Sequence, residues 1–289
     1  MTLRNNENKI TVIIIASILI LVGSLAFAFK TPSFNPRMEK EAYTIINRWK
    51  LPEKLNEISG IAWIDEGRLA CVQDEEGTIF IYNLDKNMVE KTVNFAGRGD
   101  YEGIAVVDSN AFVLRSDGTL FEILDFIKND FEVKKYTTPF SENNDMESLC
   151  YDKAENRLLL LPKEKDLESD EFLGVYTFNL NSREMEYNPI FKIEFNDPIF
   201  EKKKEQKDNS INPSDIAINP LNRHHYIVDG KNPKILILDK TGKTYKVTNL
   251  NKKKFRQPEG ITFSSKGTLY ISNEGKKGTA NILEVEIDE

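Results

Sequence analysis

Cysteine and histidine are both scarce in this sequence, and their scarcity limits the chemistry available to it. The 289 residues include two cysteines, Cys71 and Cys150, and two adjacent histidines, His224 and His225. Two cysteines are too few for a disulfide scaffold, and we expect two buried free thiols because each lies in an apolar, strand-like run. Adjacent strand residues point to opposite faces, so the histidine pair is a poor metal clamp and is expected to be structural.

The chain also lacks an excess of positive charge. It has 39 lysine and arginine residues against 46 aspartate and glutamate residues, which gives a net charge of −7. Nucleic-acid binding normally needs a basic stripe, so we expect no DNA or RNA partner. The sequence contains no nucleophile elbow, Walker loop, dinucleotide fingerprint or HExxH zinc motif. An acidic chain without these motifs suits cations better than phosphates.

A long hydrophobic run occurs at the amino terminus. Residues 10–29 (ITVIIIASILILVGSLAFAF) carry no charge and match the length of a helix that spans a bilayer. Cleavage near Ala28 is the alternative, because Ala26-Phe27-Ala28 has a small-x-small pattern. Either outcome places the bulk of the chain outside the cytoplasm, on the cell (inner) membrane or secreted to the periplasm. The predicted parts are a cytoplasmic tail at 1–9, a transmembrane signal-anchor helix at 10–29, a linker at 30–42 and a folded domain at 43–289.

Five segments of this domain repeat one short pattern. They are ISGIA at 58–62, YEGIA at 101–105, MESLC at 146–150, PSDIA at 213–217 and PEGIT at 258–262. A turn, a second apolar strand, a polar turn and a third strand follow each segment. Repeats of about 40–45 residues with several short strands are typical of a β-propeller. The sequence therefore predicts an all-β fold, a five-bladed β-propeller preceded by one N-terminal transmembrane helix.

Two further segments follow from this interpretation. Residues 46–51 precede the first repeat, and we expect them to pair with the carboxy-terminal blade and close the ring. The interval between the third and fourth repeats is longer than the others, and its charged run at 201–208 is expected to be a solvated loop.

The repeat also predicts where the polar residues meet. The first strand of each blade lines the central channel and the second runs antiparallel to it, so the start of one and the end of the other share a mouth of the channel. From the first strands this predicts a metal site of Glu102, Glu147, Glu259 and Asp215, with Ser59 and Ser214 at the channel mouth. The ends of the second strands add Asp74, Arg115, Lys163, Asp229 and Glu274.

Carboxylates that converge on an axis repel one another unless they are protonated, paired or bound to metal. Oxygen ligands favour a hard cation, and Ca²⁺ accepts them in flexible geometry. Pairing of the carboxylates with Arg115 and Lys163 is the alternative to a bound ion. The glycines Gly60, Gly103 and Gly260 are expected to allow close packing beside the axis rather than to act in catalysis.

The order Ser, Glu, Glu, Ser, Glu at the second position of the five segments resembles the SdiA-regulated, or YjiK-like, family over residues 45–287. The resemblance implies a membrane-spanning amino terminus, a five-bladed propeller and Ca²⁺ binding, but no particular activity. Ser148 and Asp215 stand where the family pattern has glycine, so this chain departs from the pattern in the third and fourth blades.

Two functions remain open from the sequence. The first is a membrane-anchored, extracytoplasmic calcium-binding module for a protein or small-molecule partner that the sequence does not identify. The second is a calcium-dependent hydrolase, similar to propeller lactonases or phytase-like phosphoesterases, in which Arg115 and Lys163 stabilise a developing oxyanion. Serine at two of the strand starts, and the lack of a histidine placed as a general base, favour the binding module over the enzyme.

Overall fold

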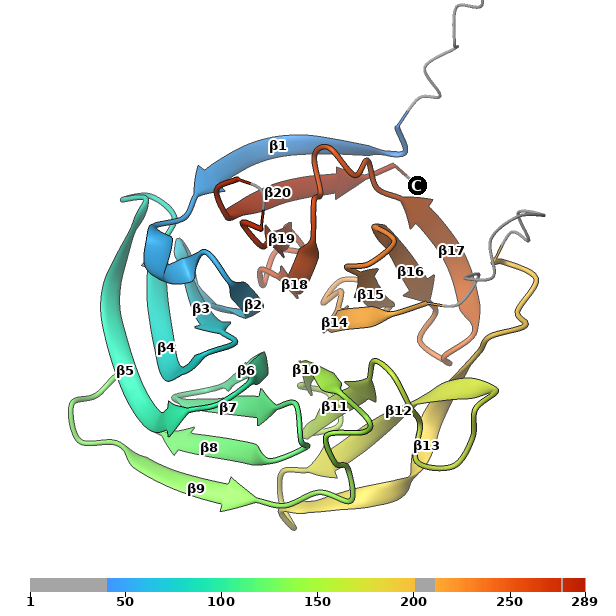
Figure 1. Cartoon of the computed structure of the whole chain (residues 1–289), viewed down its shortest axis with the longest axis horizontal. Helices are drawn as coiled ribbons and strands as arrows, with labels where there is room; N and C mark the ends of the chain where they lie inside the picture. The colour runs from blue at the N-terminus through green and yellow to red at the C-terminus, as the bar shows by residue number, and fades with distance from the viewer. Residues whose placement is uncertain (1–40, 201–210, 277, 289) are drawn as a thin grey trace, which may run out of the picture. The chain divides into compact units, whose positions relative to one another are not determined.

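The computed structural model describes residues 41–200, 211–276 and 278–288, and in these ranges the chain forms strands β1 to β20 (Figure 1). Residues 41–289 group into one compact unit. The predicted transmembrane helix at 10–29 and the charged run at 201–208 lie outside the described residues. Within the described ranges a short 3-10 turn, η1 (Glu53–Leu55), is present, and no helix there is long and apolar enough to cross a membrane.

The strands form five antiparallel sheets of four strands each, which confirms the predicted propeller with its five blades. Blade 1 contains β2 (Ile58–Asp65), β3 (Arg68–Gln73), β4 (Glu76–Asn83) and β5 (Met88–Arg98). Blade 2 contains β6 (Tyr101–Val107), β7 (Asn110–Arg115), β8 (Leu120–Leu124) and β9 (Glu132–Tyr136). Blade 3 contains β10 (Met146–Asp152), β11 (Arg157–Pro162), β12 (Phe172–Asn179) and β13 (Glu184–Glu194).

Blade 4 contains β14 (Pro213–Ile218), β15 (His225–Asp229), β16 (Lys234–Leu238) and β17 (Thr244–Asn249). Blade 5 contains β18 (Pro258–Phe263), β19 (Leu269–Asn273), β20 (Asn281–Ile287) and β1 (Tyr43–Lys50). Strand β1 pairs antiparallel with β20, so the amino-terminal strand completes the last blade, as the sequence predicts. The ring is thus closed by hydrogen bonds between segments far apart in the chain (Figure 1).

Each repeated segment forms the innermost strand of its blade. These strands, β2, β6, β10, β14 and β18, contact one another in sequence around the ring, and β18 contacts β2. Apolar side chains fill the space between neighbouring blades, for example Val72, Ile79 and Val93 of blade 1 against Ile104 and Phe121 of blade 2. Because alternating residues of a strand face opposite ways, each blade contributes to two such clusters and the core is continuous around the ring.

The glycines of the repeat allow the innermost strands to pack closely, as predicted. A Cβ atom on Gly60 would lie 2.7 Å from the carbonyl oxygen of Glu102, and one on Gly260 would lie 2.7 Å from that of Ser59. A Cβ atom on Gly103 would lie 2.7 Å from the Cβ atom of Leu149. A side chain at these positions would push neighbouring blades apart.

The scarce residues are structural in the described fold. Both thiols are free, as predicted. Cys71 is buried, whereas Cys150 is half-buried and not buried as the sequence predicts. The His225 ring is buried and packs edge-on against Phe191, with ring centroids 4.9 Å apart. His224 instead lies beside Tyr245, so the two imidazoles point to different neighbours.

Candidate functional site

One mouth of the channel collects the starts of the first strands and the ends of the second strands. The strand register pairs Ile58 with Gln73, Tyr101 with Arg115, Met146 with Pro162, Pro213 with Asp229 and Pro258 with Asn273. The polar residues beside these pairs therefore lie at one end of the ring, in the arrangement that the repeat predicts.

Three glutamates of the repeat, Glu102, Glu147 and Glu259, interact electrostatically at this mouth. Burial raises the pKa of Glu102 well above its ordinary value, and the charges of Glu147, Asp100 and Glu259 raise it further. Burial also raises the pKa of Glu147, with Glu259 and Asp145 adding to the shift and Lys163 opposing it. These residues come from three different blades, so the fold concentrates negative charge where the blades converge.

The sequence reasoning missed a second ring of oxygen-bearing side chains. The residue immediately before each innermost strand is acidic in three blades and an amide in the other two: Glu57, Asp100, Asp145, Asn212 and Gln257. This regularity is visible in the sequence, because the same position precedes all five repeated segments. Each blade therefore offers two oxygen-bearing side chains, one before its innermost strand and one at the strand's second residue.

Two acidic residues at the ends of the second strands join the same group. Burial raises the pKa of Asp74 to about 6, and the charges of Glu57 and Asp100 contribute. Burial likewise raises the pKa of Glu274, where Lys276 opposes the shift and Glu259 and Asp74 add to it. We call this group the acidic mouth; its members are Glu57, Asp74, Asp100, Glu102, Asp145, Glu147, Glu259 and Glu274.

The basic residues predicted near this mouth are held by partners. Lys163 forms an ion pair with Glu147, and both side chains are largely buried. Arg115 instead makes a two-pronged pair with Asp117, through Nη2 to Oδ2 at 2.6 Å and Nε to Oδ1 at 3.0 Å. Burial alone would raise the pKa of Asp117, but hydrogen bonds from Arg115 and Thr119 lower it to about 2. Arg115 thus neutralises a neighbour on its own blade.

Two of the predicted carboxylates serve the fold. Asp215 is 1% exposed, and its Oδ2 accepts the backbone N–H of Ile261 at 2.9 Å while its Oδ1 accepts those of Ile216 at 2.8 Å and Leu149 at 3.4 Å. These bonds join the innermost strands of blades 3, 4 and 5. Asp229 is fully buried and pairs with Lys234, with Oδ2 and Nζ 2.8 Å apart.

Several buried oxygens near the mouth have no hydrogen-bond partner among the described residues. They include Asp74 Oδ1, Ser214 Oγ and Asn273 Oδ1. Ser214 is 2% exposed and Asn273 1% exposed, so bulk water does not freely reach them. A buried oxygen without a donor is costly unless a ligand or ordered water satisfies it. Ser59, at the matching position of blade 1, is also buried, and its carbonyl oxygen accepts the Ser272 hydroxyl at 3.2 Å.

The donor set at the acidic mouth fits a hard cation. Its side chains supply oxygen and no sulfur or imidazole, which is the chemistry that Ca²⁺ prefers. In the described part of the chain, no group of three or more Asp, Glu, His or Cys residues is already gathered as a metal cluster. A bound ion would therefore draw part of its coordination from water and from neutral oxygens such as Ser214 Oγ and Asn273 Oδ1.

Residues 38–277 match the family model described as SdiA-regulated. No curated protein matches the sequence. Among solved structures, glutaminyl cyclase from Myxococcus xanthus is similar with a TM-score of 0.56 and 14% sequence identity, covering 85% of this chain and 96% of that one. A luciferin-regenerating enzyme is similar with a TM-score of 0.50 and 10% identity, covering 82% of this chain and 92% of that one. At these identities the likeness concerns the fold alone.

Proposed function

The chain belongs to the SdiA-regulated family, and we propose that its propeller is a calcium-binding module that holds the ion at the acidic mouth. The observation that carries this proposal is an imbalance of charge. Among the described residues, the ion pairs of the mouth carboxylates are those of Glu147 with Lys163 and of Glu274 with Lys276, and the other six carboxylates of the mouth have none. Such a concentration of like charge needs a cation or protons to be stable.

The proposed ligands are oxygens near the acidic mouth that form no ion pair among the described residues, and the Glu102 side chain shares a hydrogen bond with Asp100. Glu102, Glu259 and Asp74 supply charge, while Ser214 and Asn273 offer buried neutral oxygens without a donor. Glu147 is engaged by Lys163, and Asp215 by backbone N–H groups. We therefore assign these two residues to the support of the site and not to the ion itself. Water completes the coordination, as is common for calcium.

A binding role is favoured over a hydrolytic one by the contacts of the basic residues. An oxyanion stabiliser must face the position where charge develops in the transition state. Arg115 is turned to Asp117 and Lys163 to Glu147, so each cation is already used by a carboxylate of its own blade. A calcium-dependent hydrolase remains the alternative, and its mark would be turnover of a lactone or phosphoester that requires Ca²⁺.

We also propose that residues 10–29 anchor the propeller on the outer side of the cell membrane. The support is the uncharged run of twenty residues with basic residues before and after it. Extraction of the native membranes at high pH tests the anchor, since an integral protein stays in the pellet. Protease added outside spheroplasts tests the orientation, because an extracytoplasmic propeller is digested without lysis.

The experiment that tests calcium binding is a thermal melt of the full-length protein, first in chelator and then with Ca²⁺ or Mg²⁺ added. An ion present at a hundred times its dissociation constant stabilises the folded state by about 2.7 kcal/mol. For a domain of this size, that corresponds to a rise of about 5–10 °C in the melting midpoint. Mg²⁺ should have a smaller effect, because it requires stricter octahedral geometry.

A melt that neither ion shifts would reject the proposal and leave the carboxylates stabilised by protons and lysines. A Ca²⁺-dependent shift together with calcium-dependent hydrolysis of model lactones or phosphoesters would keep the metal site and replace the binding role with the enzymatic one. Turnover should be compared with that of Arg115→Met and Lys163→Met, because the hydrolytic mechanism assigns these cations to the oxyanion.

A further inference from the structure

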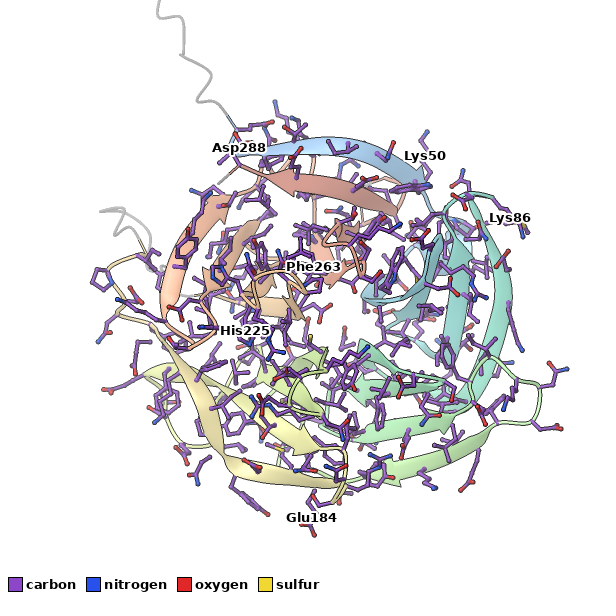
Figure 2. The ribbon with its side chains drawn as sticks, turned by 180° about the vertical axis from the view of Figure 1, so that it is seen from behind. Lys50, Lys86, Glu184, His225, Phe263 and Asp288 are labelled. Carbon is purple, nitrogen blue, oxygen red and sulfur yellow. The ribbon has the colours of Figure 1, made fainter. Side chains whose placement is uncertain are left out.

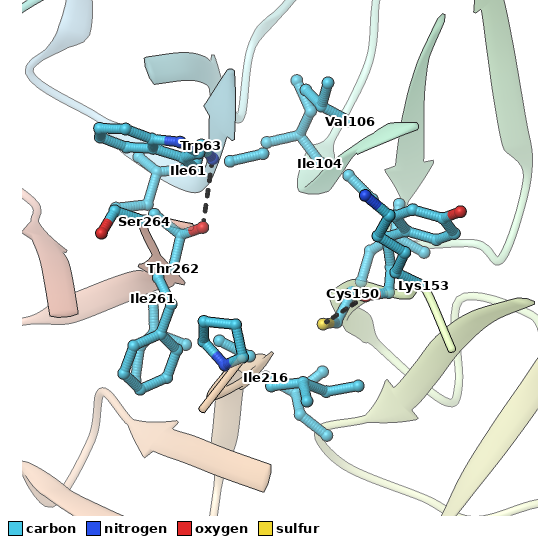
Figure 3. A pocket seen from close by; sticks show the side chains of 18 of the residues that line it. Ile61, Trp63, Ile104, Val106, Cys150, Lys153, Ile216, Ile261, Thr262 and Ser264 are labelled. Carbon is cyan, nitrogen blue, oxygen red and sulfur yellow. Dashed lines mark hydrogen bonds between the residues drawn. The ribbon is translucent and has the colours of Figure 1, made fainter. Parts of the chain in front are cut away.

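The opposite end of the innermost strands has a different chemistry. There the five strands present an apolar side chain at the same position of the repeat: Trp63, Val106, Tyr151, Ile218 and Phe263. Each of these side chains is half-buried. They surround a cavity of about 230 Å³ that takes lining residues from all five blades (Figure 3). We call this cavity the apolar mouth. Viewed from behind, Phe263 lies close to the centre of the ring (Figure 2).

Charge at the apolar mouth is limited and positive. Of the described residues that line the cavity, Lys153 alone carries a charge. No carboxylate among the described residues forms an ion pair with Lys153. Some described lysines do have such a partner, as Lys86 has Glu90 at 2.5 Å, but Lys153 is the one lysine among the described residues that line this cavity. The ammonium of Lys153 thus stands at the edge of an apolar cavity without a counter-charge.

The remaining polar groups of the cavity are mostly engaged. Thr262 Oγ1 accepts the backbone N–H of Trp63 at 3.2 Å, and Ser264 Oγ accepts that of Thr268 at 3.0 Å. Burial raises the pKa of the Cys150 thiol, so it remains protonated at neutral pH and adds no negative charge. A ligand therefore meets an apolar wall with one free cation.

From this arrangement we propose that the apolar mouth binds a small organic anion, a carboxylate carried on an aromatic or short aliphatic body. The body would contact the ring of apolar side chains, and the carboxylate would pair with Lys153. An engineered cavity of about 150 Å³ holds benzene, so a cavity of this volume accepts one aromatic ring with a short acidic side chain. Small-molecule sites are commonly apolar, with few polar groups that fix the orientation of the ligand.

The acidic mouth makes the test specific, because a bound metal there could also attract an anion. The titration is therefore carried out with the full-length protein in buffer containing a chelator. The probes are phenylacetate, 2-phenylethanol and 2-phenylethylammonium, which share an aromatic body and differ in the charge of the head group. Calorimetry reports binding, and a change in tryptophan fluorescence that is kept in Trp49→Phe, where Trp63 is the remaining tryptophan, reports that the ligand is in the apolar mouth.

We expect phenylacetate to bind in the millimolar range that is usual for ligands of this size, 2-phenylethanol to bind more weakly and 2-phenylethylammonium to bind least. Lys153→Gln should weaken the binding of phenylacetate by about fivefold, since one partly exposed ion pair is lost. The same variant should leave the affinity for 2-phenylethanol unchanged. Lys50→Gln, which removes an exposed lysine of the outer strand β1, is the matched control and should change neither. Val106→Phe narrows the cavity and should weaken both ligands.

Three results would overturn the proposal. The first is the absence of phenylacetate binding to the wild-type protein up to about 20 mM, well above the affinity expected for such a ligand. The second is equal binding of the anionic and cationic probes. The third is phenylacetate binding that Lys153→Gln and Val106→Phe both leave unchanged while the two variants melt like the wild type, because the ligand would then occupy another site.

Discussion

The substitution Glu102→Gln should have opposite effects on stability with and without calcium. Burial and the neighbouring carboxylates raise the pKa of Glu102, which means that its charged form is disfavoured in the folded protein. An amide of the same shape removes this penalty and can donate to Asp100 the hydrogen bond that the protonated Glu102 side chain makes with it. In chelator, Glu102→Gln should therefore stabilise the protein. In calcium it should destabilise the protein relative to wild type, because a charged ligand is lost.

The two effects differ enough in size to be separated. Removing one charge from a group of like charges at a partly buried site is worth on the order of 1 kcal/mol. If the loss of a ligand raises the calcium dissociation constant by about 30-fold, an ion at a hundred times the wild-type constant stabilises the variant by roughly 0.9 kcal/mol instead of about 2.7 kcal/mol. The gain in chelator should also depend on pH. A group whose pKa is raised in the folded state costs stability as the pH rises, so the gain is present at neutral pH and disappears in acid.

The assay is urea unfolding of the full-length wild-type and variant proteins, in chelator and in Ca²⁺, at neutral and at acidic pH. Glu184→Gln is the matched control, because Glu184 is an exposed glutamate on the outer strand β13, at the edge of the ring (Figure 2). It should change neither stability nor the response to calcium. The reasoning fails if Glu102→Gln destabilises the protein in chelator, since Glu102 would then be a stabilising partner and not part of a repelling group.

Three further outcomes follow from the described contacts. Lys163→Met should lower the free energy of unfolding by about 3 kcal/mol in urea titrations, because Glu147 would lose its buried partner. Gly103→Ala should lower the free energy of unfolding by about 1–3 kcal/mol, because the new Cβ atom would lie 2.7 Å from the Cβ atom of Leu149. An unchanged urea midpoint would contradict this close packing. Burial lowers the pKa of His225 from its ordinary 6.5, so its neutral ring supports the fold above that pH and this support is lost in acid. His225→Phe should flatten the difference between urea midpoints measured at about pH 5 and pH 8, and a curve parallel to wild type would contradict this.

The sequence predicts the blades well because the propeller repeats one physical unit. The glycine-bearing pattern, the turn residues and the apolar runs recur in the same order, and each copy must pack against the next. The closure by β1 also follows, since residues 46–51 have strand character and no partner within their own segment. Hydrogen bonds between β1 and β20 meet this expectation.

The candidate site is harder to predict, because it depends on which side chains engage one another. Asp215 carries a carboxylate of the kind that binds metal ions, and it stands where the other blades have glycine or serine. Its oxygens instead accept backbone N–H groups of its own strand and of a neighbouring strand. Arg115 lies two residues from Asp117, close enough to be held on its own blade. Asp100 and Asp145 lie just before the repeated segments, outside the pattern that defines the blades, so the pattern alone does not mark them as part of the site.

The two mouths differ because each innermost strand changes character along its length. The second residue of the strand is a glutamate or a serine, whereas the residue four positions later is apolar or aromatic in every blade. A ligand at either mouth would contact several blades together, so its binding free energy would be shared around the ring rather than by one blade. The ring is closed by β1, the first described strand after the proposed membrane segment. Ligand binding at either mouth and the pairing of β1 with β20 are therefore thermodynamically linked. A ligand that binds the closed ring also stabilises the pairing of β1, and stable pairing of β1 favours binding of the ligand.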